Sequence, residues 1–383
     1  MRSDAVIPWI TIETLMPDVM TVASVGETPR EFASWQRVVQ RVLAKMPAVY
    51  DSLTTARLAD ALHSARDRAE EVDLRIPTRA GHHELKLRPV FGPAGDVHGL
   101  RLWIGPAAAP AAEPRPAVGA IWDLDSQTVQ QPSGITRLPG VDVQEYVPRM
   151  SIAEVFHRMT AFDRHSEVLD LLYEPKTGAK MQFDVAVPHS SGRPGRWRVT
   201  IRARDDDRTR GAWWLIEDVS SDDQPATWST LERVGLREAH RRAGTHLAVI
   251  ELEHTSISHW LTDPAPWMRW DYLFRPVDVF HPDDRGRLIE LSGRLAAGDT
   301  AGVTVRALNY GGSYTPTSML LYPYPGYSTR QLAIAQLVRV ADDVPMMEPH
   351  REAFAARHHR VPIGYDDQLQ HRLAFRMNRS PVY

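Results

Sequence analysis

The chain has 383 residues, which is longer than most single hydrophobic cores and predicts two or three domains. Its 45 basic and 48 acidic residues give a net charge of -3, so charge does not favour nucleic acid or an anionic membrane surface as a partner. The absence of cysteine excludes disulfides, thiolate metal sites and cysteine nucleophiles, and it fits the cytoplasmic location that we expect. The N-terminus lacks the pattern of a signal peptide, and no apolar run is long enough to span a bilayer.

Two segments with linker composition divide the chain. Residues 105–117 alternate proline and alanine, which is typical of a semi-stiff spacer, and residues 220–229 are polar and broken by Pro225. The expected units are a first domain at 1–105, a linker at 106–117, a second domain at 118–220, a linker and helix at 221–243, a third domain at 244–343 and a tail at 344–383.

The first segment begins with two apolar runs, WITIETL and VMTVAS, which predict strands. Thr28, Pro29 and Glu31 then have the pattern of an N-cap, a first-turn proline and a third-position acid, so we expect a helix to begin there. A second helix is expected over residues 54–71. Alternation in residues 72–76, in HELKL and in HGLRLWI predicts three antiparallel strands after the helices.

The second and third segments repeat this order. AVGAIWDL predicts a strand, Ser151 and Glu154 predict the start of a helix that runs toward Leu172, and three alternating runs follow, with RDDDR at a hairpin. In the third segment, HLAVIELE precedes the helical region, and GVTVRAL, TSMLLYPY and RQLAIAQLVRV follow it. Each segment is therefore predicted to be an α+β unit, in which helices cover one face of a five-stranded antiparallel sheet and the other face meets water.

The third segment resembles a PAS domain. HLAVIELE is similar to the first PAS strand, FHPDDRGRLIE to the His-Pro-acid-Asp motif that opens the connecting helix, and GVTVRALNYGGSYTPTSMLLYPY to the following strand, turn and strand. The turn holds Gly311-Gly312 where family members usually have Asp-Gly. The second segment resembles PAS or the related GAF domain, with WWLIEDVS similar to the last PAS strand, and the first segment is of the same type. The chain thus resembles an actinobacterial family of tandem PAS–GAF–PAS proteins of unassigned function, although the resemblance leaves open which segment is GAF-like.

Motifs for catalysis are missing from the sequence. It has no phosphate-binding glycine loop, no H-E-x-x-H and no G-x-S-x-G, and the output modules GGDEF and EAL are absent. We therefore predict that the chain is not an enzyme and has no catalytic residue, metal or cofactor. The alternative is an unrecognised active site around His281, Asp283 and Asp284, which requires the three side chains to converge in a pocket. Pro282 and the two aspartates suit the start of a helix equally well.

The resemblance implies a ligand position between the third sheet and its covering helices. Four aromatic residues fall in that covering region, and two polar residues on and after a strand would add selectivity: Trp260, Trp267, Trp270, Tyr272, Arg306 and Asn309. The same aromatic side chains equally suit an ordinary core. His254 and His259 are either axial ligands of a haem or simple hydrogen-bonded histidines.

The resemblance implies a signalling role. We expect a non-catalytic sensor or scaffold that binds a small-molecule ligand, a protein partner or both, and that acts through a separate effector protein. A homodimer is compatible with this hypothesis, whereas nucleic acid and membrane are not expected partners. The remaining alternative is a purely structural interaction protein. Two stretches of the tail, HREAFAARHH and LQHRLAFRM, have the composition of short docking helices.

Overall fold

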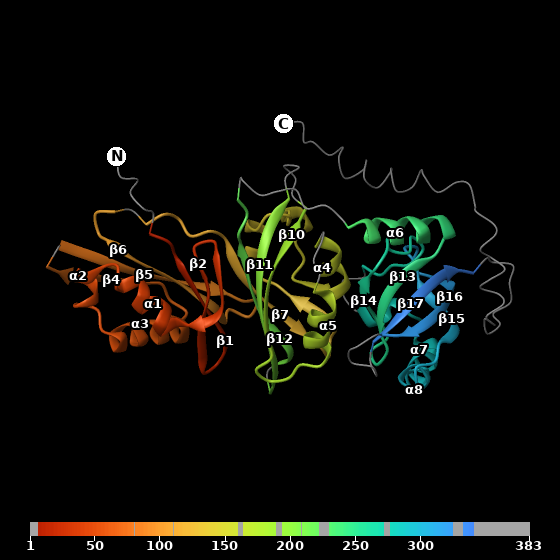
Figure 1. Ribbon diagram of the computed structural model, residues 1–383. Coiled ribbons are helices and arrows are strands. Elements are labelled where there is room, and N and C mark those ends of the chain that lie inside the picture. Colours follow the sequence, from red (N-terminus) through yellow and green to blue (C-terminus); the bar gives the residue numbers. More distant parts are fainter. Residues whose placement is uncertain are drawn as a thin grey trace.

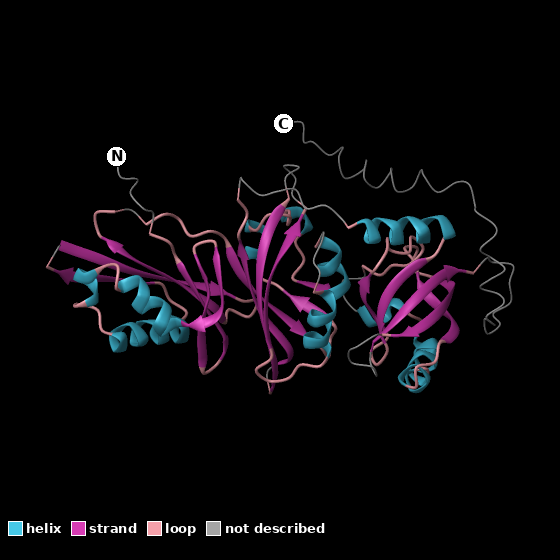
Figure 2. Ribbon diagram, viewed as in Figure 1, coloured by secondary structure: helices cyan, strands magenta, loops and turns pink. Residues whose placement is uncertain are grey.

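A computed structural model describes residues 7–79, 81–109, 111–159, 164–188, 194–207, 209–221, 230–271, 276–324 and 332–340. Within these ranges the chain forms three antiparallel sheets, which follow one another along the molecule and carry helices packed against them (Figures 1 and 2). No helix of the described part is both long enough and apolar enough to cross a membrane.

Sheet A forms the first domain, with three helices on one of its faces. Its strands lie in the order β3-β2-β1-β6-β5-β4. Apolar residues of the helices, such as Trp35 and Leu62, join Ile12 and Leu87 of the sheet in one core. The elements are β1 (Ile10–Met16), β2 (Val19–Val25), β3 (Thr28–Ser34), α1 (Trp35–Leu43), α2 (Pro47–Tyr50), α3 (Thr55–Arg68), β4 (Val72–Thr78), β5 (Gly81–Phe91) and β6 (Val97–Pro106).

Strand β3 corrects the prediction that a helix begins at Thr28. Thr28 and Pro29 pair with β2 at the edge of the sheet, where the missing N–H of proline is tolerated. Helix α1 begins only at Trp35, with Ser34 as its N-cap. Phe32, later in the same strand, lies under the guanidinium of Arg202 of the second domain, 4.8 Å away. The helix predicted over residues 54–71 forms as α3, which begins after Thr54 as its N-cap and ends at Arg68.

Sheet B forms the second domain and has the strand order β10-β11-β12-β7-β8-β9. Ser151 caps α4 and accepts a hydrogen bond from the Glu154 N–H at 3.2 Å, as predicted. The predicted continuation of this helix to Leu172 is wrong, because α4 ends at Arg158 and a separate helix α5 follows. The elements are β7 (Ala117–Asp123), β8 (Thr128–Gln130), β9 (Arg149–Ser151), α4 (Ile152–Arg158), α5 (His165–Tyr173), β10 (Lys180–Val187), β11 (Gly195–Asp206) and β12 (Thr209–Asp218).

Sheet C forms the third domain, and helix α6 (Leu231–Ala243) leads into it. Its strand order is β14-β13-β17-β16-β15. Leu288 and Leu295, from the helices that follow β14, pack on the sheet. Ile289, next to Leu288 on α7, is exposed. The elements are β13 (His246–Glu251), β14 (Ser256–Trp260), η3 (Pro276–Val279), α7 (Pro282–Glu290), α8 (Ser292–Ala296), β15 (Ala301–Leu308), β16 (Tyr314–Pro323) and β17 (Leu332–Arg339).

The prediction of three antiparallel sheets is confirmed, but the prediction of five strands holds for sheet C alone. Sheets A and B each have six strands. In both, the first strand of the domain pairs with the last, and the second and third strands extend the sheet on the far side. The first two domains therefore share one strand order, and the third lacks their additional edge strand.

The second face of sheet B is buried, which corrects the prediction that it meets water. Trp197, Val199 and Ile201 of β11 face the helices of their own domain, while Arg198 and Arg202 between them face sheet A and are only 3% and 5% exposed. Nε and Nη2 of Arg202 donate to a carboxylate oxygen of Glu13 on β1, at 3.0 and 2.6 Å. Sheets A and B thus pack against each other through charged side chains whose partners lie across the interface.

A buried histidine lies in this interface. The imidazole of His98 on β6 stacks on Trp213 of β12, with ring centroids 4.4 Å apart, and its Nδ1 lies 2.8 Å from the carbonyl oxygen of Trp214. Its Nε2 has no hydrogen-bond partner among the described residues. Burial, only partly opposed by the Trp214 carbonyl, lowers the pKa of His98 to about 4. The ring is therefore neutral at pH 7.

We expect acidification to weaken the fold through His98. The unfolded chain binds a proton near pH 6.5, whereas the folded protein does not until about pH 4, so the contribution of His98 is complete above pH 6.5 and is lost as the pH falls toward 4. The full loss is about 3 kcal/mol. Chemical denaturation of the wild type and of His98→Phe between pH 7 and pH 4 measures it. Equal pH dependence in the two proteins would contradict the prediction.

Gly119 is expected to be essential for the position of His98. A Cβ built on Gly119 would lie 2.4 Å from Cγ of His98. This atom joins the imidazole ring to the rest of the side chain, so it cannot move aside as the end of a flexible side chain could. Gly119→Ala should therefore lower the free energy of unfolding by about 1–3 kcal/mol, measured by urea denaturation. The control is Gly235→Ala, where a Cβ meets nothing within 4 Å. The double variant Gly119→Ala/His98→Ala should lose less than the sum of the two single changes.

Candidate functional site

The aromatic residues that we predicted to line a ligand pocket divide into two groups. Trp260 and Trp270 are buried, and their rings meet edge to face with centroids 6.1 Å apart. Trp267 lies beside β16, where its Nε1 donates to Oγ1 of Thr317 at 3.0 Å. Tyr272 lies outside the described residues. Ligand binding by these residues stays a prediction, and the geometry brings together only Trp260 and Trp270.

The two predicted polar residues are held by their own chain. Three nitrogens of Arg306 donate to Asp284: the backbone N at 2.8 Å, Nε at 2.9 Å and Nη2 at 3.0 Å. Oδ1 of Asn309 accepts from the N–H groups of Gly311 and Ser313, at 2.9 and 3.1 Å. Arg306 thus fastens strand β15 to the start of α7, and Asn309 closes the turn before β16.

The alternative active site around His281 has the geometry of a helix start. Nδ1 of His281 accepts a hydrogen bond from the Asp283 N–H at 3.3 Å, and Asp283 is largely exposed. Burial would raise the pKa of Asp284, but the hydrogen bonds and the charge of Arg306 outweigh burial and hold this pKa below its ordinary value. An ionised carboxylate paired with arginine and a capping histidine account for this cluster without a catalytic role.

Helix α4 lies between the second and third domains, and each domain uses one side of it. Val155 and Phe156 belong to the core under sheet B, whereas Ala153 belongs to the core of the third domain. The ring of His157, also on α4, meets Trp270 edge to face at 5.2 Å. Figure 1 shows α4 at the boundary between the two domains, facing sheet C. A short rigid element therefore contacts two cores at once.

A stack of histidine rings joins the same two domains. His259 on β14 stacks on His165 of α5 with centroids 4.5 Å apart, and it meets Phe156 edge to face at 5.1 Å. Nδ1 of His259 has no hydrogen-bond partner within the described ranges. Burial, aided by the nearby positive groups of His165 and Arg233, holds the pKa of His259 well below its usual range. The ring therefore packs as a flat neutral group.

A chain of hydroxyl and amide groups forms a further link between these domains. The hydroxyls of Tyr173 on α5 and Ser256 on β14 both donate to Oε1 of Gln127, at 3.2 and 2.9 Å. The hydroxyl of Ser258 donates to Tyr173 at 2.8 Å. Burial raises the pKa of Tyr173, so the phenol stays protonated. These neutral hydrogen bonds fix β14 against the second domain.

Glu251, Glu253 and His254 are the only group in the described part of the chain with the spacing of a metal site. The carboxylate of Glu251 already accepts hydrogen bonds from the N–H groups of Glu253 and His254, at 2.9 and 2.7 Å, and from Nδ1 of His254 at 3.2 Å. The hydrogen bond that His254 donates to the carboxylate of Glu251 raises the pKa of His254. The group therefore closes the turn between β13 and β14.

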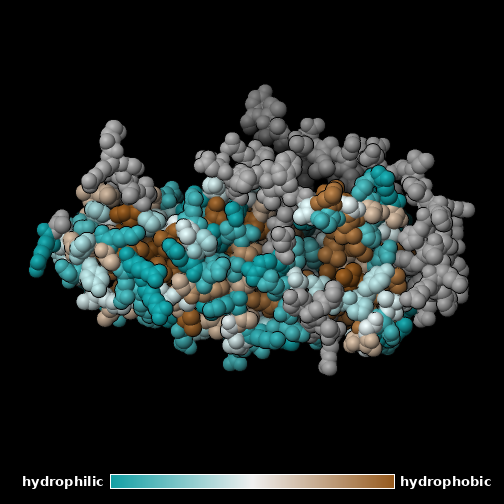
Figure 3. Space-filling view, viewed as in Figure 1, coloured by the Kyte–Doolittle hydropathy of each residue, from teal (hydrophilic) through white to brown (hydrophobic). Residues whose placement is uncertain are grey.

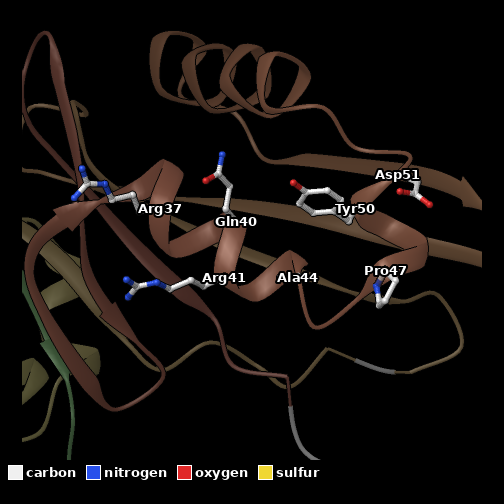
Figure 4. A pocket seen from close by; sticks show the side chains of 7 residues that line it. All are labelled: Arg37, Gln40, Arg41, Ala44, Pro47, Tyr50 and Asp51. Atoms are coloured by element: carbon white, nitrogen blue, oxygen red, sulfur yellow. The ribbon is translucent and has the colours of Figure 1, made fainter.

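Two hollows bear on ligand binding. The interior of the second domain holds a cavity of about 20 Å³ beneath α4, lined in part by Val155, Met159 and Trp214. The Nε1 of Trp214 has no partner in the described structure, and the space suits a single water molecule. On the first domain, a groove of about 550 Å³ follows α1 and α2, with Arg37 and Arg41 along it and Tyr50 nearby (Figure 4). Small-molecule pockets usually measure about 300–1,000 Å³, so the interior cavity is too small for such a ligand.

The sequence found part of this arrangement. The sequence identifies Trp260 and Trp270 as ligand contacts or core residues, and His254 and His259 as haem ligands or hydrogen-bonded histidines, but it does not identify any of them as a contact between domains. The role of α4 was missed, although the run IAEVFHR is apolar on more than one side of a helix, which is typical of an element buried on both sides.

Comparisons with known proteins relate the first domain to a family model and nearly the whole chain to one solved structure. Residues 8–114 match the family model described as Rv3651-like, N-terminal, a range that contains all of sheet A. A search of curated protein sequences finds no match. Two light-oxygen-voltage proteins align at 12% identity. One is described as an RNA-binding receptor, with a TM-score of 0.23 over 68% of this chain and 99% of its own. The other is an RsLOV variant, with a TM-score of 0.22 over 30% of this chain and 73% of its own. Such low TM-scores carry no argument.

A crystal structure of an uncharacterized protein from Mycobacterium tuberculosis aligns with nearly the whole chain. The TM-score is 0.70 at 17% identity, and the alignment covers 93% of this chain and 99% of that one. At this identity the likeness shows the fold alone. The first domain is therefore similar to Rv3651-like N-terminal domains, and the chain shares its overall fold with the mycobacterial protein.

Proposed function

We propose that the chain is a non-catalytic signalling protein in which PAS-like and GAF-like domains pass a change of state from one to the next and on to a separate effector protein. The observation that carries this proposal is the position of α4, which belongs to the cores of the second and third domains at the same time. The five antiparallel strands of sheet C and the helices between β14 and β15 support the PAS-like assignment. A homodimer and a cytoplasmic location belong to the same proposal.

The packing around α4 gives the signal a physical route. Because protein interiors are close-packed, a shift of Val155 in the second core displaces Ala153, two residues away and 0% exposed, in the third. His157 would move with them against Trp270. Two cores that share one helix in this way can bias each other's conformation.

The sizes of the hollows favour a macromolecular input over a small ligand enclosed in a domain. The cavity under α4 has a volume of about 20 Å³, whereas the groove on α1 and α2 is open to solvent. We therefore propose that protein partners provide both the input and the output, and that a small ligand is enclosed in the second domain only if the space under α4 opens.

A pair of matched variants tests transmission through α4. Val155→Ala and Val199→Ala remove the same atoms from the second core, but only Val155 lies on α4. Each should destabilise the second domain by about 1–2 kcal/mol. In Val155→Ala alone, the opening free energy of the β14 amides should also fall, by about 0.5–2 kcal/mol, as measured by native-state hydrogen exchange. If the opening free energy of the β14 amides falls equally in both variants, or in neither, then α4 does not transmit the change between the two domains.

A further inference from the structure

Helix α6 is unusual because it has 13 residues and none of them is buried. Leu231 is 83% exposed and Val234 is 50% exposed. A helix of this length is marginal in water by itself, and in proteins most of the stability of a helix comes from packing an apolar face. The exposed leucine and valine therefore indicate that another segment covers α6.

The open face of α6 can be identified from its residues. Leu231, Val234, Gly235 and Glu238 lie three or four positions apart, which places them on one side of the helix. A Cβ built on Gly235 would meet nothing within 4 Å. Arg237 is tied to the third domain by an ion pair with Asp263. Figure 3 shows apolar side chains gathered at the end of α6 where the helix begins.

The chain itself leaves the third domain next to this helix. Strand β17 runs antiparallel to β13, and Leu337 pairs with His246, the first residue of β13. Val340 therefore lies three residues beyond the start of β13, at the end of the strand where the chain enters from Gly244 at the C-cap of α6. Residues 341–383 start at this point.

The tail contains a segment that fits the open face of α6. In LQHRLAFRM, residues 369–377, Leu369, Leu373 and Met377 recur at a spacing of four, which predicts one apolar stripe along a helix. We propose that residues 369–377 dock on the outward face of α6 and cover Leu231 and Val234. This contact is independent of the signalling role proposed above.

Geometry favours the tail of the same chain over a second copy. Helix α6 is about 20 Å long and about 10 Å wide, so two copies pairing through it would bury on the order of 400 Å², against about 1,200 Å² for a stable interface. A tethered segment needs less contact area, because the tether gives an effective concentration of about millimolar. The 28 residues between Val340 and Leu369 reach up to about 95 Å when extended, far more than the length of α6.

Cysteine pairs in the full-length chain test the contact, since the native sequence contains no cysteine. Gly235→Cys with Ala374→Cys should form a disulfide within one chain on mild oxidation. The control pairs Ala374→Cys with Gly286→Cys, on α7, where a Cβ likewise meets nothing within 4 Å. Peptide mapping by mass spectrometry should find the first disulfide forming about tenfold faster or more. Equal rates, or a link only between chains that increases with protein concentration, would overturn the proposal.

Hydrogen exchange supplies a second measurement that needs no cysteine. In the full chain carrying Leu369→Asp and Leu373→Asp, the amides of residues 231–243 should exchange about tenfold faster than in the wild type. The strands of sheets A and B should keep their protection, which shows that the variant folds. Unchanged exchange in α6 would mean that residues 222–229 or a second copy covers the helix, and would refute docking by the tail.

Discussion

Each sheet of this protein has two faces, and both must be covered. Helices of the same domain cover one face of each sheet. The other face of sheet A lies on sheet B, and the other face of sheet C lies on the second domain. Strand β13 shows the consequence in three residues, since Ala248 and Ile250 join the core of the third domain while Val249 between them joins that of the second. The three domains therefore stay together because each sheet buries its second face against a neighbouring domain.

The same constraint explains what the sequence predicted and what it did not. The alternation of RWRVTIRA identified β11 and its apolar face, and Ser151 and His281 identified helix starts, because strand period and capping are local properties. The partner of the polar face is not local. Arg198 and Arg202 have the same pattern whether they meet water or the carboxylate of a distant strand. The helix start predicted at Thr28 and Pro29 is wrong for the same reason, since their pairing with β2 is a contact that a local capping pattern does not reveal.

The residues around α4 could be predicted from the sequence only in part. Aromatic residues are easily identified as large buried groups, so Trp260 and Trp270 were found, but their neighbour His157 comes from another domain. The stack of His259 on His165 likewise joins residues far apart in the chain. Periodicity shows which face of a helix or strand is apolar, but it does not show which other element packs against that face. For this reason the fold of each domain was more predictable than the contacts between domains.

The two interfaces differ in the chemistry that holds them. Between sheets A and B, buried charged groups meet in fixed geometry: Arg202 pairs with Glu13, and Arg198, which is paired with Asp184 within sheet B, also donates to the backbone carbonyl of Glu27 on the first domain. Separating such groups leaves charges without partners, which costs several kcal/mol unless water reaches them at once. Between the second and third domains, a shared apolar core that includes Val249 is accompanied by hydrogen bonds between neutral hydroxyl and amide groups, which contribute about 1 kcal/mol each, and no buried ion pair is described there. Rearrangement between domains should therefore be easier at the interface that contains α4, while the first two domains move as one body.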